Sequence, residues 1–94
     1  MKIHLKVEGI APLYKTLRNK KELDVDFRGS TVRDLVNNLG NKYGPGVSKA
    51  ILDPQGEIDM ELRVVVNWEN FLPYGERMDA TLNDGDILHL MTVG

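Results

Sequence analysis

The sequence predicts an α+β domain in which a helix packs on one face of a mixed β-sheet. In several short segments apolar residues alternate with polar ones, which is typical of strands with one buried face. One longer segment instead places its apolar residues at the three- and four-residue spacing of a helix. Strand-like segments lie on both sides of this helix, with no repeat and no linker. This order favours a single α+β domain over residues 1–94.

The first two predicted strands lie near the N-terminus. Residues 3–7 and residues 22–28 both alternate apolar and polar side chains, so we expect two strands that pair as a hairpin. Residues 9–21 contain Gly, Pro and a basic cluster, and they predict a long loop with at most one helical turn. The cations of this loop are either a solvated face or a contact for an anion or a partner. The side chains expected to hold the loop down are Leu13, Tyr14 and Leu17.

The central helix is the best-defined element. Ser30 or Thr31 can cap its N-terminus. Its apolar face consists of Val32, Leu35, Val36, Leu39 and Tyr43. Glycine and proline at positions 44–46 end it. Residues 47–52 are expected to form a second, short helix, and residues 53–56 a β-turn.

The C-terminal half predicts two further strands. Residues 62–68, LRVVVNW, predict a strand in which Val64 and Val66 should point inward. Residues 67–83 contain Pro and Gly and predict a hairpin or a loop. The segment Asn83-Asp84-Gly85-Asp86 predicts a tight turn in which glycine takes a positive φ and the aspartates bind nearby backbone amides. The last strand should cover residues 87–93, with Leu88 and Leu90 in the core.

Composition excludes several classes of function. The chain contains no cysteine, which rules out disulfides, thiolate metal sites and thiol nucleophiles. It has neither a phosphate-binding glycine loop nor the serine elbow of hydrolases. The N-terminal residues lack the apolar core of a signal peptide, and no apolar run approaches the roughly 18 residues of a membrane span. We therefore expect a cytoplasmic protein.

The charges are divided unevenly along the chain. Residues 1–42 carry nine Lys and Arg against five Asp and Glu, and residues 43–94 carry three against nine. The asymmetry either serves solubility alone or lets the acidic half meet a basic partner. No basic stripe is interleaved with aromatic residues, so we do not expect nucleic acid to be a ligand.

The order of elements, together with three short sequence features, resembles the MoaD/ThiS family of ubiquitin-like sulfur carriers. The features are Val66-Asn67 after the third strand, Asp84-Gly85-Asp86 before the last strand, and the terminal Gly94. The resemblance covers nearly the whole chain. It implies a ubiquitin-like β-grasp fold: a mixed four- to five-stranded sheet with one main helix packed on one face.

The resemblance also implies a function. In this family an ATP-using activating enzyme adenylates the C-terminal glycine carboxylate, which is then converted to a thiocarboxylate. This chain would accordingly carry sulfur on Gly94 for molybdopterin or thiamine biosynthesis. It would have no catalytic residue and no bound cofactor, and ATP would belong to the activating enzyme. Its partners would be that enzyme and a sulfur-accepting biosynthetic enzyme.

The C-terminus departs from the family in one position. Val93 stands where the family has the first glycine of a Gly-Gly end, and a β-branched residue stiffens the tail. Two alternatives therefore stay open. One is a non-catalytic β-grasp interaction module, and the other is a ubiquitin-like protein modifier that is joined to a lysine amine.

The sheet face opposite the helix is the predicted docking face. The residues expected on it are Val65, Ile87, His89, Met91 and Val93. As an exposed apolar strip it would resemble the face through which ubiquitin-like proteins dock on their partners. Alternatively, residues 68–74 cover it. His4 and His89 could meet on this face, but two ligands without a third make a weak metal site, so we expect no metal.

Overall fold

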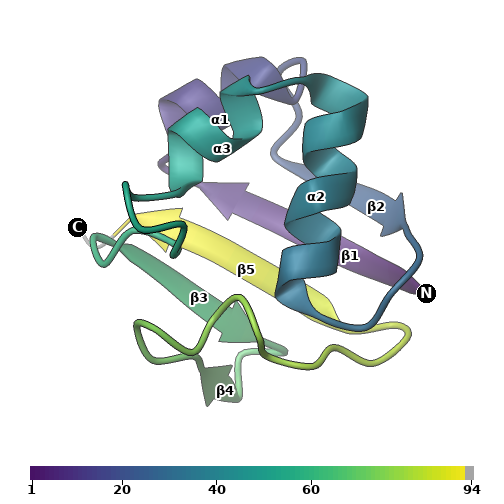
Figure 1. Cartoon of the computed structure of the whole chain (residues 1–94). Coiled ribbons are helices and arrows are strands. Elements are labelled where there is room, and N and C mark those ends of the chain that lie inside the picture. The colour runs from purple at the N-terminus through teal and green to yellow at the C-terminus, as the bar shows by residue number, and fades with distance from the viewer. Residues whose placement is uncertain (93–94) are drawn as a thin grey trace.

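The computed structural model describes residues 1–92, which form five strands and three helices (Figure 1). The elements are β1 (Lys2–Glu8), α1 (Ala11–Thr16), β2 (Glu22–Asp26), α2 (Val32–Tyr43), α3 (Gly46–Ile51), β3 (Leu62–Val66), β4 (Asn70–Phe71) and β5 (Ile87–Thr92). Val93 and Gly94, two of the predicted site residues, lie outside the described residues.

The strands form one mixed sheet in the order β2-β1-β5-β3-β4. β1 pairs antiparallel with β2, as the predicted hairpin requires, and β1 and β5 are parallel. β3 pairs antiparallel with both β5 and β4. All three helices lie on the same side of the sheet (Figure 1). The α+β class and the mixed sheet are thus confirmed, and the last strand occupies the middle of the sheet.

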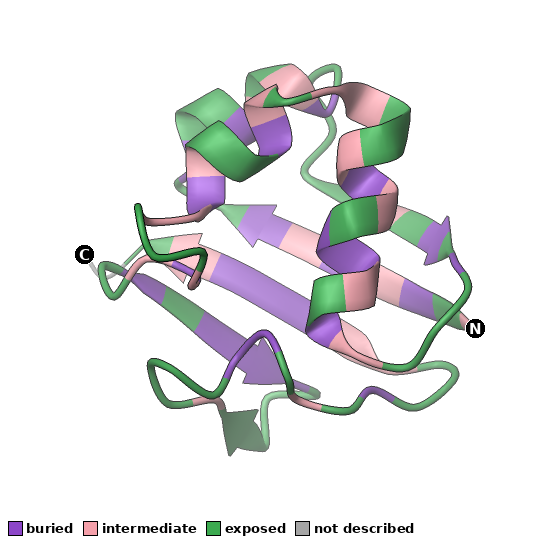
Figure 2. Ribbon diagram, viewed as in Figure 1, coloured by how far each residue is buried: buried purple, intermediate pink, exposed green. Residues whose placement is uncertain are grey.

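The core lies between the sheet and the helices, because alternate strand residues point to the same face. The predicted inward residues Val64, Val66, Leu88 and Leu90 are all buried. The apolar stripe of α2 covers them. Its four members Val32, Leu35, Val36 and Leu39 are buried, whereas Tyr43 at the end of the helix is only partly so (Figure 2).

Helix α2 begins at a complete capping box. The Thr31 hydroxyl accepts a hydrogen bond from the Asp34 amide (3.2 Å), and the Asp34 carboxylate accepts one from the Thr31 amide (3.1 Å). The Ser30 amide donates to the same carboxylate (2.9 Å). These bonds stabilise the charged form and hold the pKa of Asp34 below its usual value. Of the two predicted caps, Thr31 is therefore the one used.

The segment 9–21 is more ordered than its composition indicates. We expected a loop with at most one turn, but residues 11–16 form helix α1, with proline in its first turn. Proline fits there because the first amides of a helix have no internal partner. Leu13 and Leu17 are fully buried and hold the helix down, as predicted for these side chains. The single main helix implied by the family resemblance is thus accompanied by two shorter ones.

Strand β3 is shorter than the predicted 62–68. It ends at Val66 because the next two residues, Asn67 and Trp68, have φ values of 55° and 59°, which a strand cannot contain. The chain turns there and returns as β4. The predicted turn at 53–56 is confirmed: the Gly56 amide donates to the Asp53 carbonyl (3.0 Å).

Candidate docking face and end of the last strand

The central strand β5 carries the chain toward its C-terminal glycine. Met91 lies opposite Glu8 at the end of β1, and Thr92 lies opposite Leu62 at the start of β3. β5 therefore ends level with the neighbouring strands on both sides (Figure 1). Gly94 follows two positions later in the sequence. The sheet thus fixes the point from which the terminal residues leave.

Gly9 packs directly against this point. Its φ is +72°, and a Cβ built on it would overlap the Thr92 hydroxyl oxygen. A side chain is thus excluded twice, by backbone conformation and by space. Glycine lets the turn between β1 and α1 approach the end of β5. Gly9 was not among the residues predicted to be functional. The feature of the sequence that could have identified it is a glycine directly after a predicted strand.

The family-like motifs fasten the opposite end of β5. Asn67 accepts a hydrogen bond from the Ile87 amide (2.8 Å) and donates one to the Asp86 carboxylate (3.0 Å). Asp84 accepts from the Lys2 amide (2.7 Å), and Asp86 accepts from the Asn83 amide (2.8 Å). Gly85 has a φ of +90°. The predicted tight turn is confirmed, and its hydrogen bonds hold the start of β5 against β1 and the end of β3.

Four of the predicted docking residues share the outer face of the sheet. His89 lies opposite Val65 on one side and Lys6 on the other, and Ile87 and Met91 precede and follow it on the same face of β5. The prediction that they form an exposed strip is wrong for two of them, because Val65 and His89 are 0% and 1% exposed. Ile87 and Met91 are partly exposed.

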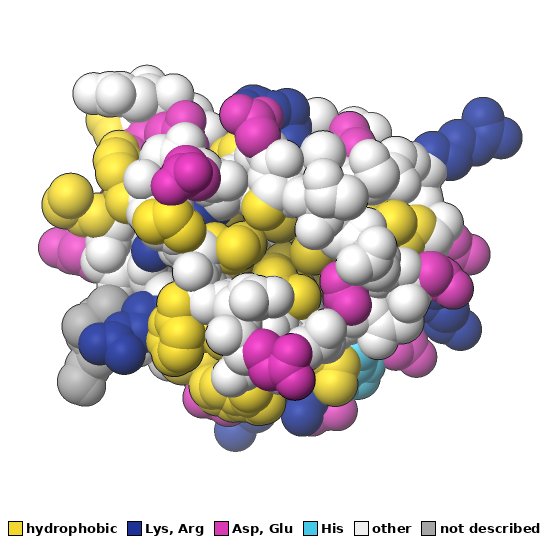
Figure 3. Space-filling model, turned by 90° about the horizontal axis from the view of Figure 1, so that it is seen from below, with side chains coloured by type: hydrophobic (Ala, Val, Ile, Leu, Met, Phe, Trp, Pro, Cys, Tyr) yellow, Lys and Arg dark blue, Asp and Glu magenta, His cyan; other side chains and the backbone are white. Residues whose placement is uncertain are grey.

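The side chain of Trp68 covers His89. Its ring lies on the imidazole of His89, with 3.9 Å between ring centroids and 39° between ring planes. Trp68 itself is 55% exposed, and Phe71, opposite Val65, is 61% exposed. Seen from below, hydrophobic side chains lie among charged ones (Figure 3). The outer face is therefore aromatic beside the β3–β4 hairpin, whereas β1 and β2 place Lys6, His4 and Asp24 on the same face.

The remaining residues of 68–74 take different roles. Leu72 packs against the core. The Tyr74 hydroxyl donates to the Asp53 carboxylate (2.5 Å), which lowers the pKa of Asp53 and raises that of Tyr74. The two alternatives for this segment thus apply to different residues: Trp68 covers the sheet, and Phe71 extends the exposed surface.

The two histidines have opposite environments. Neither ring nitrogen of His89 has a hydrogen-bond partner, and burial, with a smaller effect of Lys6, lowers its pKa. His4 lies between Asp24 (2.8 Å) and Glu22 (3.0 Å). The hydrogen bond that the His4 ring donates to the Asp24 carboxylate is the main reason why the pKa of His4 is raised. The surroundings of His89 therefore favour its neutral form, whereas those of His4 favour its cationic form.

The described residues offer no metal centre and no membrane span. Within residues 1–92, no group of three or more His, Asp or Glu side chains could hold a metal ion. Likewise, none of the helices described in that range is long and apolar enough to cross a membrane.

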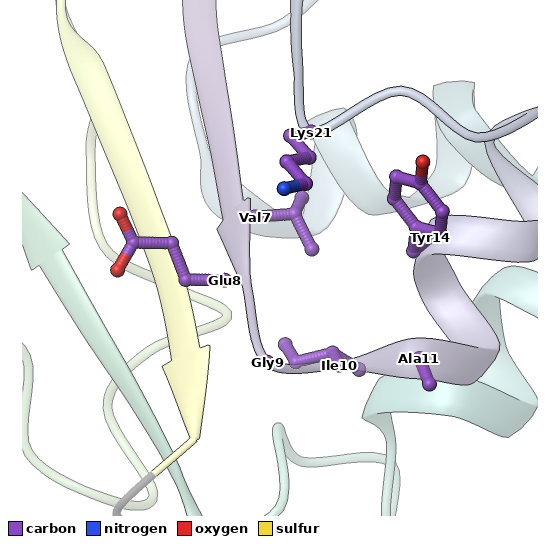
Figure 4. A pocket seen from close by; sticks show the side chains of 7 residues that line it. All are labelled: Val7, Glu8, Gly9, Ile10, Ala11, Tyr14 and Lys21. Carbon is purple, nitrogen blue, oxygen red and sulfur yellow. The ribbon is translucent and has the colours of Figure 1, made fainter.

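Two hollows lie near the ends of β1 and β5, the first between β1 and helix α1 and the second beside Thr92. One is lined by Val7, Glu8, Gly9, Ile10, Ala11, Tyr14 and Lys21. Tyr14 and Lys21 stand across it from Gly9 and Ala11 (Figure 4). The other is lined by Met60, Glu61, Leu62 and Thr92. Tyr14 and Lys21 were expected in a loop; the hollow forms because residues 11–16 are helical and the Val7 amide donates to the Lys21 carbonyl (2.7 Å).

Solved structures with the same architecture include three informative ones. A chain of the Amycolatopsis orientalis BexX/CysO complex is 16% identical with a TM-score of 0.76, over 98% of this chain and 96% of that one. Small archaeal modifier protein 1 from H. volcanii is 20% identical with a TM-score of 0.72, over 99% and 98%. A putative molybdopterin converting factor, subunit 1, from Pyrococcus furiosus is 19% identical with a TM-score of 0.64, over 100% and 99%.

The similarity to these proteins lies in the structure. No protein-family model and no curated protein matches the sequence. The similar structures nevertheless align along nearly their whole length, with TM-scores of 0.64 to 0.76, over a chain whose five strands form one mixed sheet with helices on one face. The chain thus has the ubiquitin-like β-grasp fold, and the resemblance to MoaD/ThiS-type proteins is confirmed at the level of the fold.

Proposed function

We propose that the chain is a cytoplasmic sulfur carrier whose Gly94 carboxylate is adenylated by an activating enzyme and converted to a thiocarboxylate. The observation that carries this proposal is the position of β5. It is a central strand, paired on both sides up to Met91 and Thr92, and Gly94 follows two positions beyond it. If the proposal holds, this paired strand supports the terminal segment that a partner enzyme would bind.

The chemistry requires only a carboxylate from this chain. A carboxylate oxygen attacks the α-phosphorus of ATP, pyrophosphate leaves, and an acyl adenylate forms. Hydrosulfide (HS⁻) then attacks the acyl carbon, AMP leaves with that oxygen, and the proton of the hydrosulfide is released. The product is a thiocarboxylate at Gly94. The catalytic groups and the nucleotide site belong to the partner, in keeping with a chain that acts as a carrier and not as an enzyme.

The outer sheet face is the proposed docking surface for the partners. Ile87, Met91, Trp68 and Phe71 are its accessible apolar members. Val65 and His89 support it from below, and Val93 would extend it toward the carboxylate. Large aromatic and Met side chains are typical of the well-packed centre of an interface. The likeness to a chain of the BexX/CysO complex supports a function exercised together with a partner enzyme.

The acceptor of the sulfur is the finer part of the proposal. The likeness to a putative molybdopterin converting factor subunit supports transfer into a cofactor precursor of the molybdopterin type, and thiamine remains the other pathway of this class. The likeness to a small archaeal modifier protein favours a second candidate, attachment of the activated carboxylate to a lysine amine. The two differ only in the group that attacks the activated carboxylate.

Reconstitution with a candidate activating enzyme, ATP and a sulfur donor tests the proposal. Conversion of the carboxylate to a thiocarboxylate replaces oxygen by sulfur and adds about 16 Da to the intact mass. A chain lacking Gly94 should bind the partner and gain no mass. If deletion of Gly94 leaves every partner-dependent activity unchanged, the chain is an interaction module. Stable adducts on lysines of other proteins would instead identify a modifier.

The docking surface has a separate test. Phe71→Ser removes an exposed aromatic ring from the outer face and should weaken partner binding at least tenfold, as expected for an aromatic anchor. Asn41→Ser, at an exposed position of α2 on the opposite side of the sheet, is the matched control. Equal binding by both variants would place the interface elsewhere.

A further inference from the structure

Strand β2 forms an open edge of the sheet. In the order β2-β1-β5-β3-β4 it lies at the margin (Figure 1), and within residues 1–92 its one partner strand is β1. It is five residues long, whereas β4 at the other margin has two. The backbone amides and carbonyls along such an edge can pair with a further strand.

The hydrogen bonds to β1 show which residues of β2 face this edge. The Met1 ammonium donates to the Phe27 carbonyl (3.0 Å), and the Phe27 amide donates to the Met1 carbonyl (2.9 Å). Along an antiparallel pair, every second residue is bonded to the neighbouring strand in this way. Glu22, Asp24 and Asp26 therefore direct their backbone amides and carbonyls away from β1.

The side chains of these three residues, the β2 carboxylates, all lie on the outer face of the sheet. They are 61%, 62% and 80% exposed. If two copies of the chain paired antiparallel about Asp24, this residue would meet its own copy, and Glu22 would meet Asp26. Like charges directly opposite each other destabilise a strand pair. A second copy of the chain is therefore a poor occupant of the edge.

Strand β1 shows which pattern is complementary to β2. Opposite the β2 carboxylates it places Lys2, His4 and Lys6, and between them Ile3 and Leu5 point into the core. Opposite charges on directly opposed residues stabilise a strand pair. Because the β2 carboxylates remain mostly exposed in this pairing, they have room for further cations on the open side.

A hollow between β2 and the C-terminal half of α2 lies beside the open edge. Its apolar lining comes from Leu23 and Val25 on the strand and from Leu39 and Tyr43 on the helix. Lys42 also lines the hollow, and its ammonium lies over the Tyr43 ring, 5.5 Å from the centroid. The inner side of the edge therefore favours apolar side chains over cations, whereas the outer side, with the β2 carboxylates, favours cations.

We propose that the open edge of β2 binds an extended segment of another protein in which basic residues alternate with apolar ones. The segment adds a strand to the sheet. Its basic side chains pair with the β2 carboxylates, and its apolar side chains enter the hollow beneath α2. Lys21 and Arg28 flank the carboxylates in the sequence, so the segment is about as long as the five residues of β2. The inference does not depend on sulfur transfer, because β1 separates β2 from β5.

Nuclear magnetic resonance with a synthetic peptide tests this proposal. The probe is Lys-Ile-Lys-Leu-Lys-Val, acetylated and amidated at its ends. At about 1 mM peptide, the amide resonances of Glu22, Asp24 and Asp26 should shift, and these amides should exchange more slowly with solvent. The acidic peptide Glu-Ile-Glu-Leu-Glu-Val should leave them unchanged. Methylation of the lysine backbone nitrogens keeps the charge, removes the donors that face β2 and should weaken binding about tenfold or more.

A pair of protein variants provides the matched control. Asp26→Asn removes one of the β2 carboxylates and should weaken peptide binding about two- to fivefold. Glu76→Gln removes an exposed carboxylate from the segment after β4 and should leave binding unchanged. The proposal is overturned if the β2 amides do not respond to the basic peptide, or if the methylated peptide binds equally well. Shifts of the same amides with protein concentration alone would assign the edge to a second copy and would also overturn it.

Discussion

Replacing Gly9 by alanine tests whether the end of β5 is fixed by the turn after β1. At a φ of +72°, a residue with a Cβ loses about 1–2 kcal/mol relative to glycine. The new Cβ also overlaps the Thr92 hydroxyl oxygen, and overpacking of this kind adds about 1–3 kcal/mol. We therefore expect Gly9→Ala to lower the free energy of unfolding by about 2–5 kcal/mol.

Urea unfolding followed by circular dichroism measures this loss. Two further variants separate the contribution of the backbone conformation from that of the steric overlap. Gly75→Ala has a similar φ, +87°, but open space around the new Cβ, so it should lose only about 1–2 kcal/mol. Thr92→Ala in the Gly9→Ala background removes the overlapping oxygen and should restore stability to the level of Gly75→Ala. Equal losses for Gly9→Ala and Gly75→Ala, or no rescue by Thr92→Ala, would refute the contact.

Three other predictions concern stability. Arg77→Met should lower the free energy of unfolding in urea by about 2–4 kcal/mol, because the buried guanidinium donates to three backbone carbonyls. A loss below about 1 kcal/mol would contradict this prediction. Thr31→Ala should cost about 1 kcal/mol and Ser30→Ala much less, since only Thr31 caps α2. His4→Gln should be less stable than the wild type below pH 6.5. Because the folded-state pKa of His4 is raised, this difference should shrink as pH rises through that value; a constant difference would contradict the pairing.

The fold was largely predictable because its strongest signals are local. The spacing of apolar residues defines α2, and alternation defines β1 and the inward residues of β5. Helix α1 was not predicted, because glycine, proline and a basic cluster are typical of loops. Its order comes from Leu13 and Leu17, whose burial depends on the rest of the core. Tertiary packing decides such short helices more than propensity does.

The candidate site was predictable only in part. Alternation correctly assigned Val65, Ile87, His89 and Met91 to one face. Alternation could not predict how exposed these residues are. Trp68 covers His89 because the two residues after Val66 have positive φ values. In the sequence, the only sign of this backbone conformation is Asn67, which is a weak signal. Gly9 was missed because its role depends on the pairing of two strands that are far apart in the sequence.

The intact mass of the protein, purified from its own host and mapped at the C-terminus, tests the central claim most directly. The account predicts a fraction that is about 16 Da heavier, with the additional mass on Gly94. This fraction should increase with the activating enzyme, ATP and a sulfur donor. The claim would be contradicted if Gly94 keeps an ordinary carboxylate after incubation with an activating enzyme that forms thiocarboxylates on other carriers.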